Sequence, residues 1–513
     1  MTVRANPSRH PARSPIHAAT HLIGIAIAIL LAALAAPASA QLISVKTVPI
    51  AQGDQFDFFP SRNQGMASIS IAVSDTLLDP FSNPAKASRL RGSHFFGTPT
   101  FFSVSSKAGG GRTLPVTAIA SSRSLFGGIG IAFQEIDAAR RADFFPVFAP
   151  SIVPSAEKSH HNRYAFAMAG KTFATAGVSV AASVFGAGLE AVDGVDLLYA
   201  GSQSIEQRGQ MTDVRLGILK EWSPAQSLEA VVVHNRYRSK HDVTYANWFW
   251  DPDTRTTVPR PRVDHNLDRT NTSGVHLAYV QPIRATGWRV GGLLTANRLT
   301  HPKIPNYEIM NIPRDPGHSN AFNIGLGASK MLAGSTFGID AIYEPIRTNT
   351  WAEAAGPTVS ANGVVIPTGG KTVENRFRFS NALVRIGMGQ DFKTTDGEHE
   401  AGFQFGLGVR SIHYWLQQDN NVVRSRRHQE ERWIEWTPTW GTSFRFPQVE
   451  IRYRGRQTSG TGRPGVVRQV GRGIGVEDNL ASAPSIVAAP SGELTLDKVR
   501  VVTHQFSVSF PVR

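Results

Sequence analysis

Few residues in this chain have the types and spacing that catalysis or metal binding requires. The Gly-Lys-Thr run at 170–172 resembles the end of a phosphate-binding loop, but Ala165 replaces the earlier glycine of that motif. The pair His160-His161 is interpreted as solvated, and the Asp-Pro-Asp-Thr run at 251–254 lacks the glycine and distal glutamate of a calcium loop. No HExxH, GxSxG or cysteine motif occurs. We expect no catalytic residue, no metal and no cofactor, and predict that the protein is not an enzyme.

Charged residues instead occupy the polar positions of segments in which every other residue is apolar. An arginine that faces lipid at mid-depth costs about 2–4 kcal/mol, so we expect these side chains to face an aqueous interior. One interpretation is an interior stiffened by salt bridges. The other is a charged path in which arginines bind the carboxylate of an amphiphile. The set comprises Arg289, Asp340, Glu344, Arg385, Arg410, Glu435, Arg445, Glu450, Arg452 and Arg454.

The alternating segments are the elements that must position these charges. Phe322, Ile324 and Leu326 alternate with polar or glycine residues, and the same pattern recurs around Phe403 and Phe506. Alternation with period two indicates strands with one apolar and one polar face. A span of about 9–11 residues is enough for a tilted strand to cross a bilayer, whereas strands of soluble proteins average about 5–6 residues. The sequence therefore predicts an all-β fold, a transmembrane antiparallel β-barrel, with a large secreted sandwich or propeller as the alternative.

The number of strands and the lengths of their connections support a barrel. Connections at 174–176, 223–226, 284–287, 333–334 and 447–448 are tight, whereas 240–268, 301–318, 349–375, 418–430 and 458–497 are long. Outer-membrane barrels have short turns at one end and long loops at the other. We expect 14–16 strands, with a bulge near 380–382. The sixteen candidates are 98–106, 113–121, 125–137, 163–173, 177–189, 211–222, 227–239, 269–283, 288–300, 319–331, 336–348, 376–392, 401–417, 431–446, 449–457 and 498–512.

The composition agrees with export and with alternating faces. The 513 residues include 47 glycines and no cysteine, with a net charge of +14 and a mean hydropathy of −0.16. Arg4, Arg9 and Arg13 precede an apolar run that ends in Ala-Ser-Ala at 38–40. This order is typical of a cleaved secretory signal, with a membrane anchor as the alternative. We predict a signal peptide at 1–40, an N-terminal hatch or plug at 41–97 and the barrel at 98–513.

The predicted plug provides a resemblance to a known family. A glycine at Gly65, small residues, an acidic loop with Asp79 and Phe81, and then Asn83-Pro84-Ala85 resemble the start of the outer-membrane long-chain fatty-acid transporters. Related shuttle-like barrels of type IX secretion start similarly. The resemblance implies a hatch inside a 14-stranded barrel, which hydrophobic substrates pass before leaving sideways into the membrane. It implies that Asn83, Pro84, Ala85, Asp79 and Phe81 shape the plug and substrate path.

The sequence and the resemblance together lead to one functional expectation. We expect a bacterial outer-membrane barrel for passive transport of hydrophobic or amphipathic small molecules, with a non-transporting scaffold or secretion shuttle as the alternative. The expected partners are outer-membrane lipid and lipopolysaccharide, the hydrophobic substrate and the barrel-assembly machinery. Basic runs at 255–262 and 424–427 have the charge to meet lipopolysaccharide phosphates. We expect no nucleic-acid partner.

Overall fold

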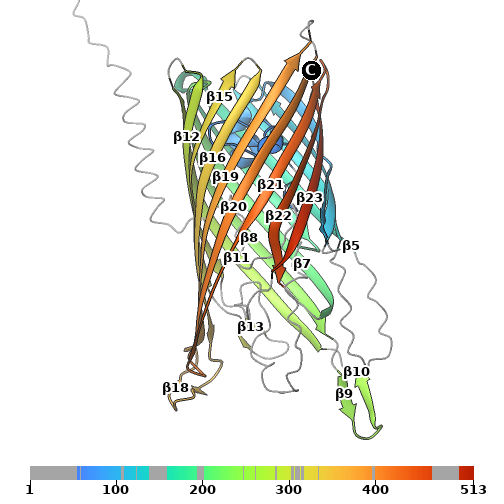
Figure 1. Ribbon diagram of the computed structural model, residues 1–513, viewed down its shortest axis with the longest axis vertical. Coiled ribbons are helices and arrows are strands. Elements are labelled where there is room, and N and C mark those ends of the chain that lie inside the picture. The colour runs from blue at the N-terminus through green and yellow to red at the C-terminus, as the bar shows by residue number, and fades with distance from the viewer. Residues whose placement is uncertain are drawn as a thin grey trace, which may run out of the picture.

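The computed structural model describes residues 55–512 with gaps, so the predicted signal peptide and residues 41–54 lie outside the described residues. The gaps are 58, 106–108, 123, 138–158, 193–201, 246–247, 260–261, 284–285, 302–304, 307–311, 314–316, 333, 395–398 and 465–495. In the described ranges, no helix is long and apolar enough to cross a membrane. The tilted strands form a tall barrel, shown from the side in Figure 1.

The wall is a closed antiparallel barrel with sixteen strand positions among the described residues. Both β1 and β2 pair with β3 on one side and β23 on the other, so they share one position of the 17-stranded sheet. Closure satisfies the backbone hydrogen bonds that an open edge would leave exposed to lipid. The predicted count of sixteen is confirmed, two more than the 14 that the family resemblance implies.

All sixteen predicted segments coincide with wall strands, although the first position starts at Gly92 rather than at residue 98. The wall strands are β1 (Gly92–Gly97), β2 (Thr100–Val104), β3 (Gly110–Ser121), β4 (Leu125–Asp137), β5 (Ser159–Phe173), β6 (Val178–Leu189), β7 (Ser202–Ser223), β8 (Gln226–Tyr245), β11 (Arg262–Pro282), β12 (Trp288–His301), β15 (Gly317–Leu332), β16 (Ser335–Glu353), β19 (Lys371–Lys393), β20 (Glu400–Asn420), β21 (Ser425–Arg445), β22 (Glu450–Pro464) and β23 (Leu496–Val512).

The two ends of the barrel differ, as the sequence predicts. Tight connections, including η4 (Ala174–Ala176), gather at the end where β23 finishes, which we call the short-turn end. The opposite long-loop end contains three small hairpins (Figure 1). They are formed by β9 (Trp248–Asp251) and β10 (Thr256–Pro259), β13 (Pro305–Asn306) and β14 (Ile312–Pro313), and β17 (Thr358–Val359) and β18 (Val365–Ile366).

Several predicted loops are instead strands. The expected loop at 418–430 shrinks to a turn at 421–424, because β20 and β21 continue to Asn420 and from Ser425. Residues 240–245 and 262–268 of the expected loop 240–268 likewise belong to β8 and β11. The predicted strands 227–239 and 401–417 are too short, because the hydrogen-bonded ladders continue to Tyr245 and Asn420.

The alternation reverses its sense along the strands. On β20, Phe403, Phe405 and Leu407 point outward toward lipid, while the inward positions between them are glutamine or glycine. Further toward the long-loop end, the inward residues Ile412 and Tyr414 are buried, while Ser411 and His413 point outward. We call the part with outward apolar residues the membrane band, and the part beyond it the outer extension.

This reversal also corrects the predicted bulge. The ladders of β19 with β16 and with β20 run without interruption through Ser380–Ala382. Phe377 and Phe379 point into the barrel, whereas Val384 points outward, so the apolar residues change faces without a change of register. An uninterrupted ladder keeps every backbone hydrogen bond, which a bulge would disrupt.

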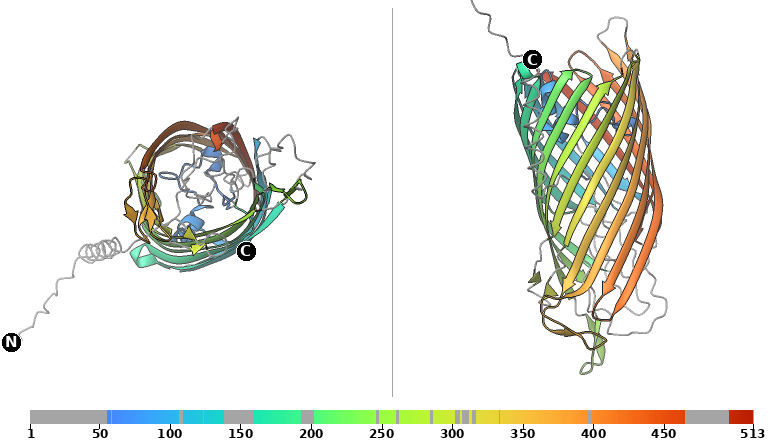
Figure 2. Two further views of the ribbon diagram at one scale, coloured as in Figure 1. Left: turned by 90° about the horizontal axis from the view of Figure 1, so that it is seen from below. Right: turned by 90° about the vertical axis from the view of Figure 1, so that its left-hand side faces the viewer.

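The described part of the plug, residues 55–91, lies inside the barrel near the short-turn end (Figure 2). It contains η1 (Gln64–Met66), α2 (Asp79–Ser82) and η2 (Pro84–Arg89). The buried Asp75 carboxylate links separate parts of the plug. It accepts hydrogen bonds from the Ser61 hydroxyl at 2.6 Å and from the Asn63 and Leu77 backbone amides at 3.0 and 3.2 Å. The Asp75 carboxylate thus accepts hydrogen bonds from backbone amides of the plug that have no partner within its short helices.

Candidate functional site

The predicted Asn83-Pro84-Ala85 signature connects the plug to the wall. The Asn83 side-chain oxygen accepts a hydrogen bond from the Ala85 amide at 3.1 Å, which caps η2, and Pro84 occupies its first position. The Asn83 amide group donates to Glu229 of β8 at 3.0 Å and to the Ile218 carbonyl of β7 at 3.4 Å. Gly217 is required here, because a Cβ would lie 3.0 Å from the Pro84 Cδ and still closer to the Asn83 side chain.

Around this cap lies a buried ionic cluster. Lys86 is 2.9 Å from Glu229 and 3.3 Å from Asp79, and Arg89 is 2.9 Å from Glu221 of β7. Burial raises the pKa of the Asp79 carboxyl to about 6, while the Lys86 ammonium acts in the opposite direction. Burial opposes the charge of Lys86, yet Asp79 and Glu229 hold its pKa above the usual range. The predicted residue Asp79 therefore lies in a buried ionic contact between the plug and the wall.

Phe81, also predicted, belongs to an apolar cluster between the plug and β3–β7. Its ring stacks on Phe59 at 4.0 Å and lies 5.0 Å from the Phe166 ring. The cluster also includes Leu77 of the plug and Ile119 and Met168 of the wall. Arg215 of β7 donates hydrogen bonds to the Phe81 and Ser82 carbonyls at 3.2 and 3.1 Å, which satisfies the end of α2.

Two predicted interior charges hold the other side of the plug. The Asp340 carboxylate of β16 accepts from the Ser70 and Ile71 amides at 2.8 and 3.4 Å. Arg385, opposite Asp340 on β19, donates to the Ser68 carbonyl at 3.1 Å. The plug backbone also comes close to inward-facing glycines: a Cβ on Gly327 would lie 2.6 Å from the Ile71 Cβ. These charges act as anchors for the plug backbone.

The other predicted charges have different environments. Arg410 pairs with Glu344 at 3.1 Å, at the inward boundary between the membrane band and the apolar interior of the outer extension. Arg445 pairs with Glu400 at 2.8 Å and Glu450 at 3.2 Å near the short turns. Arg289 lies on the inward face of β12 opposite Ser329 of β15. The charges therefore do not form one continuous path.

An arginine row on β22 faces the edge of the plug. Arg452 contacts Glu450, Arg456 lies 2.9 Å from Asp57, and Arg454 donates to the Arg62 carbonyl at 3.2 Å. Arg454 is 3% exposed, and its Nε and Nη1 atoms have no hydrogen-bond partner in the described part of the protein. The Nε of Arg62 is likewise buried without a partner there. Buried guanidinium donors without acceptors are costly, so an added anionic group would stabilise these unpartnered donors.

The interior of the outer extension is apolar. Phe377, Phe379, Tyr414 and Ile346 form one buried cluster, with Trp433 packed against it. The Tyr414 ring lies 5.0 Å from that of Phe379. The Tyr414 hydroxyl and the Trp433 Nε1 are buried without a hydrogen-bond partner among the described residues. The side chains of this cluster are at most 3% exposed, so they form a packed aromatic core with isolated polar tips.

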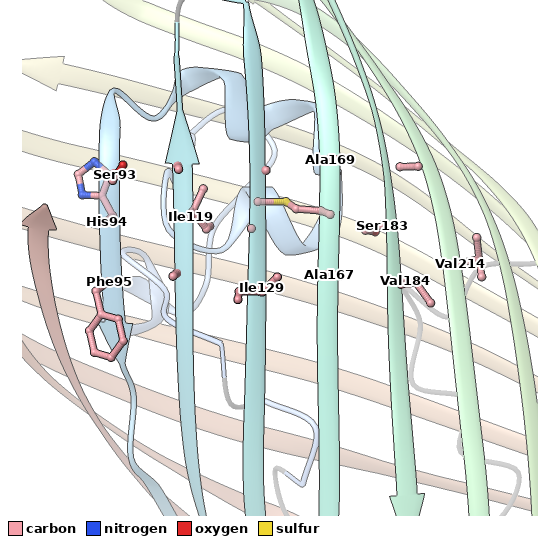
Figure 3. Close-up of a pocket in the computed structure, with 16 residues that line it drawn as sticks. Ser93, His94, Phe95, Ile119, Ile129, Ala167, Ala169, Ser183, Val184 and Val214 are labelled. Atoms are coloured by element: carbon pink, nitrogen blue, oxygen red, sulfur yellow. The ribbon is translucent and has the colours of Figure 1, made fainter.

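A third apolar feature lies on the outside of the wall. A hollow of about 770 Å³ faces lipid beside β1, where small side chains on β3–β6 leave space (Figure 3). Phe95, Ala118, Ala169 and Val184 are among its lining residues. The wall position next to the hollow is interrupted between β1 and β2, at Thr98 and Pro99. The nitrogen of Pro99 carries no hydrogen, so it cannot donate to the ladder.

Sequence reasoning missed several residues that hold this arrangement together. Asp75, Arg215 and Glu229 were not predicted as site residues, and Arg62 lies in a segment read as irregular. One signal was present: glycines such as Gly327 and Gly406 occupy the inward phase of their strands, where the plug approaches. Among the described residues there is no group of three or more His, Asp or Glu side chains arranged to hold a metal ion.

No protein-family model and no curated protein sequence matches this chain. Among solved structures, a FadL homologue of Pseudomonas aeruginosa is 10% identical, with 90% of this chain and 100% of that one covered and a TM-score of 0.42. The toluene transporter TbuX of Ralstonia pickettii is 9% identical, with 88% and 97% covered and a TM-score of 0.38. The ferric-catecholate import receptor Fiu of E. coli K12 is 8% identical, with 81% of each chain covered and a TM-score of 0.35. These similarities are too distant to support a functional argument.

Proposed function

We propose that this protein is a bacterial outer-membrane barrel that transports hydrophobic or amphipathic small molecules passively, around its plug and sideways into the membrane. One observation supports this most directly: Ile119 and Met168 belong both to the apolar cluster around the plug and to the lining of the lipid-facing hollow. At this place only the wall, which carries small side chains on β3–β6, separates the plug from lipid, and its ladders are unbroken when the wall is closed. An apolar molecule crossing there would not enter water.

The charged and apolar features of the interior favour an amphipathic substrate over a purely apolar one. The apolar cluster of the outer extension, which is packed in this structure, would have to open to receive the hydrocarbon part from the long-loop end. The free donors of Arg454 and Arg62 then supply a position for a carboxylate or a similar anion near the plug. Long-chain fatty acids have this chemistry and are the substrate class that we propose.

The absence of cysteine from the chain permits a direct test of sideways exit. Phe95 of β1 and Ala118 of β3 are paired across the ladder and both line the hollow. In the double variant Phe95→Cys/Ala118→Cys, oxidation should join these strands. We expect uptake of labelled oleate by cells to stop after oxidation and to return after reduction.

A matched pair of cysteines distinguishes exit at the hollow from general stiffening of the barrel. Leu326 and Ala341 are cross-strand partners that face outward elsewhere in the wall. The variant Leu326→Cys/Ala341→Cys should take up oleate equally in both redox states. Uptake that is insensitive to the first crosslink contradicts sideways exit. If the intact protein takes up no more oleate than an empty strain, transport of this class is contradicted and a scaffold or shuttle role becomes the better explanation.

A further inference from the structure

A basic patch on the outside of the barrel is not used by the proposed transport function. It lies on the outward face of β7, β8 and β11, in the outer extension. A hollow of about 330 Å³ marks it, and four of its lining residues are the basic side chains Arg208, Arg238, Lys240 and Arg269. We propose that this patch binds a phosphorylated glycolipid of the outer leaflet, such as lipopolysaccharide, through phosphate groups on its sugars.

The register of the strands places like charges directly opposite one another. Arg208 of β7 is the cross-strand partner of Lys240 of β8, and Arg238 of β8 is the partner of Arg269 of β11. Like charges in such positions repel and destabilise a sheet. An anion bound between them would relieve this repulsion, so the arrangement favours occupation by a negatively charged ligand.

The described carboxylates beside this patch are Glu206 of β7 and Asp242 of β8, which are cross-strand partners and compensate part of its four positive charges. Asp242 lies 3.2 Å from Lys240 and is also in contact with His265. Arg208, Arg238 and Arg269 are exposed and form no salt bridge with a described residue. Arginine presents a planar pair of donors that matches phosphate oxygens, so three free guanidinium groups suit more than one phosphate.

The height of the patch selects the kind of lipid. On β8, Val232 is the last outward apolar residue, and His234, Arg236, Arg238 and Lys240 follow on the same face. With a rise of about 3.3 Å per residue and a tilt of about 40°, Arg238 lies roughly 15 Å above Val232 along the barrel axis. The polar layer of a phospholipid bilayer adds only about 5–8 Å per side. A phosphorylated sugar headgroup extends far enough to meet these arginines.

The test uses the purified full-length barrel in detergent and lipopolysaccharide with phosphorylated core sugars, with retained lipid measured by native mass spectrometry. We expect Arg238→Gln/Arg269→Gln to weaken retention at least about tenfold, because each of the two basic residues contributes about fivefold to binding at a charged lipid surface. The same lipopolysaccharide after enzymatic dephosphorylation should bind the unmodified barrel equally weakly.

The control removes the same charge elsewhere in the outer extension. Arg426 and Arg432 face outward on β21 and are each 2.6 Å from a carboxylate, that of Asp419 or Glu430. Arg426→Gln/Arg432→Gln should retain lipopolysaccharide within about twofold of the unmodified protein. The proposal is overturned if both double variants lose binding equally. It is also overturned if dephosphorylation has no effect, or if phosphatidylglycerol or inorganic phosphate displaces the lipopolysaccharide at equal concentration.

Discussion

The membrane band and the outer extension are built from the same strands, yet their two faces are exchanged. On β19, the membrane band points Val384, Ile386 and Met388 outward and faces Arg385 and glycines toward the plug. In the outer extension of the same strand, Phe377 and Phe379 point inward and Arg376 and Arg378 point outward. The difference follows from the solvent outside, which is hydrocarbon in one part and water in the other.

This comparison shows that alternation alone does not identify the lipid-facing side of a strand. The period of two is the same in both regions, and only the identity of the outward residues marks where the membrane ends. An apolar interior beside a polar exterior also means that the outer extension is stabilised in the same way as a soluble β-protein. Its core is then a protein core, whereas the outer face of the membrane band contacts lipid.

The largest expected effect removes an aromatic ring from the interior of the outer extension. Phe379, which is 3% exposed, packs on Tyr414, so Phe379→Ala should lower the free energy of unfolding by about 3–5 kcal/mol. Phe337→Ala on the lipid-facing side of β16 should cost less, because acyl chains fill the vacated space. Denaturant titration of the barrel in lipid vesicles measures both. Equal losses would contradict the assignment of the two faces.

The second prediction introduces a charge on the outward face of one strand in each region. Leu326 of β15 is 71% exposed on the outward face within the membrane band, so Leu326→Arg should destabilise the barrel by about 2–4 kcal/mol. His318→Arg on the same face in the outer extension, where the cross-strand partners Thr300 and Asn349 are uncharged, should change stability by less than about 0.5 kcal/mol. The same titration measures the difference. A large loss for both variants would place the membrane boundary further toward the long-loop end.

The third prediction concerns space for the plug. A Cβ on Gly406 of β20 would lie 2.5 Å from the Met66 carbonyl carbon, whereas on Gly408 it would lie 3.6 Å from the nearest atom, the Thr437 Cβ. Gly406→Ala should therefore lower stability by about 1–3 kcal/mol and expose the plug to protease, while Gly408→Ala should do neither. Limited proteolysis of the folded barrel is the measurement. Protection that is unchanged in Gly406→Ala would argue against close docking of the plug at β20.

The smallest expected effect is a pH dependence of plug docking. The docked Asp79 has a pKa near 6, above the 3.8 of an exposed aspartate, so the docked state binds a proton more tightly. Docking should therefore become more favourable as the pH falls from about 6 toward 4, and the dependence should disappear in Asp79→Asn. Protease protection of the plug at pH 7.5 and pH 5 measures it, with Asp253→Asn in an exposed turn as the control. Weaker protection at pH 5 in the unmodified protein would reverse the predicted sign.

The sequence predicts the barrel better than it predicts the site. Alternation identifies all sixteen wall positions because each outward residue in the membrane band must match lipid. Alternation misleads beyond that band. There Phe377 points inward and Arg376 points outward, and this reversal leads to the incorrect prediction of a bulge at 380–382. The plug contacts were not predictable, since partners such as Ser70 and Asp340 are far apart in sequence and meet only when the barrel closes. Asn83 was found through the family resemblance of the Asn83-Pro84-Ala85 run, whereas its bond to Glu229 is a tertiary contact that no local pattern shows.

The shared position of β1 and β2 has a consequence for biogenesis. Both short strands pair with β23, so the first wall segment to be synthesised finds one of its neighbours only when the last has been made. The plug precedes β1 in the chain and lies within the ring that this final pairing closes. The plug must therefore be inside before the ring is sealed, or be threaded in afterwards through one of its ends. Enclosure during assembly needs no opening wide enough for a folded segment, and it makes the β23 pairing the step that traps the plug.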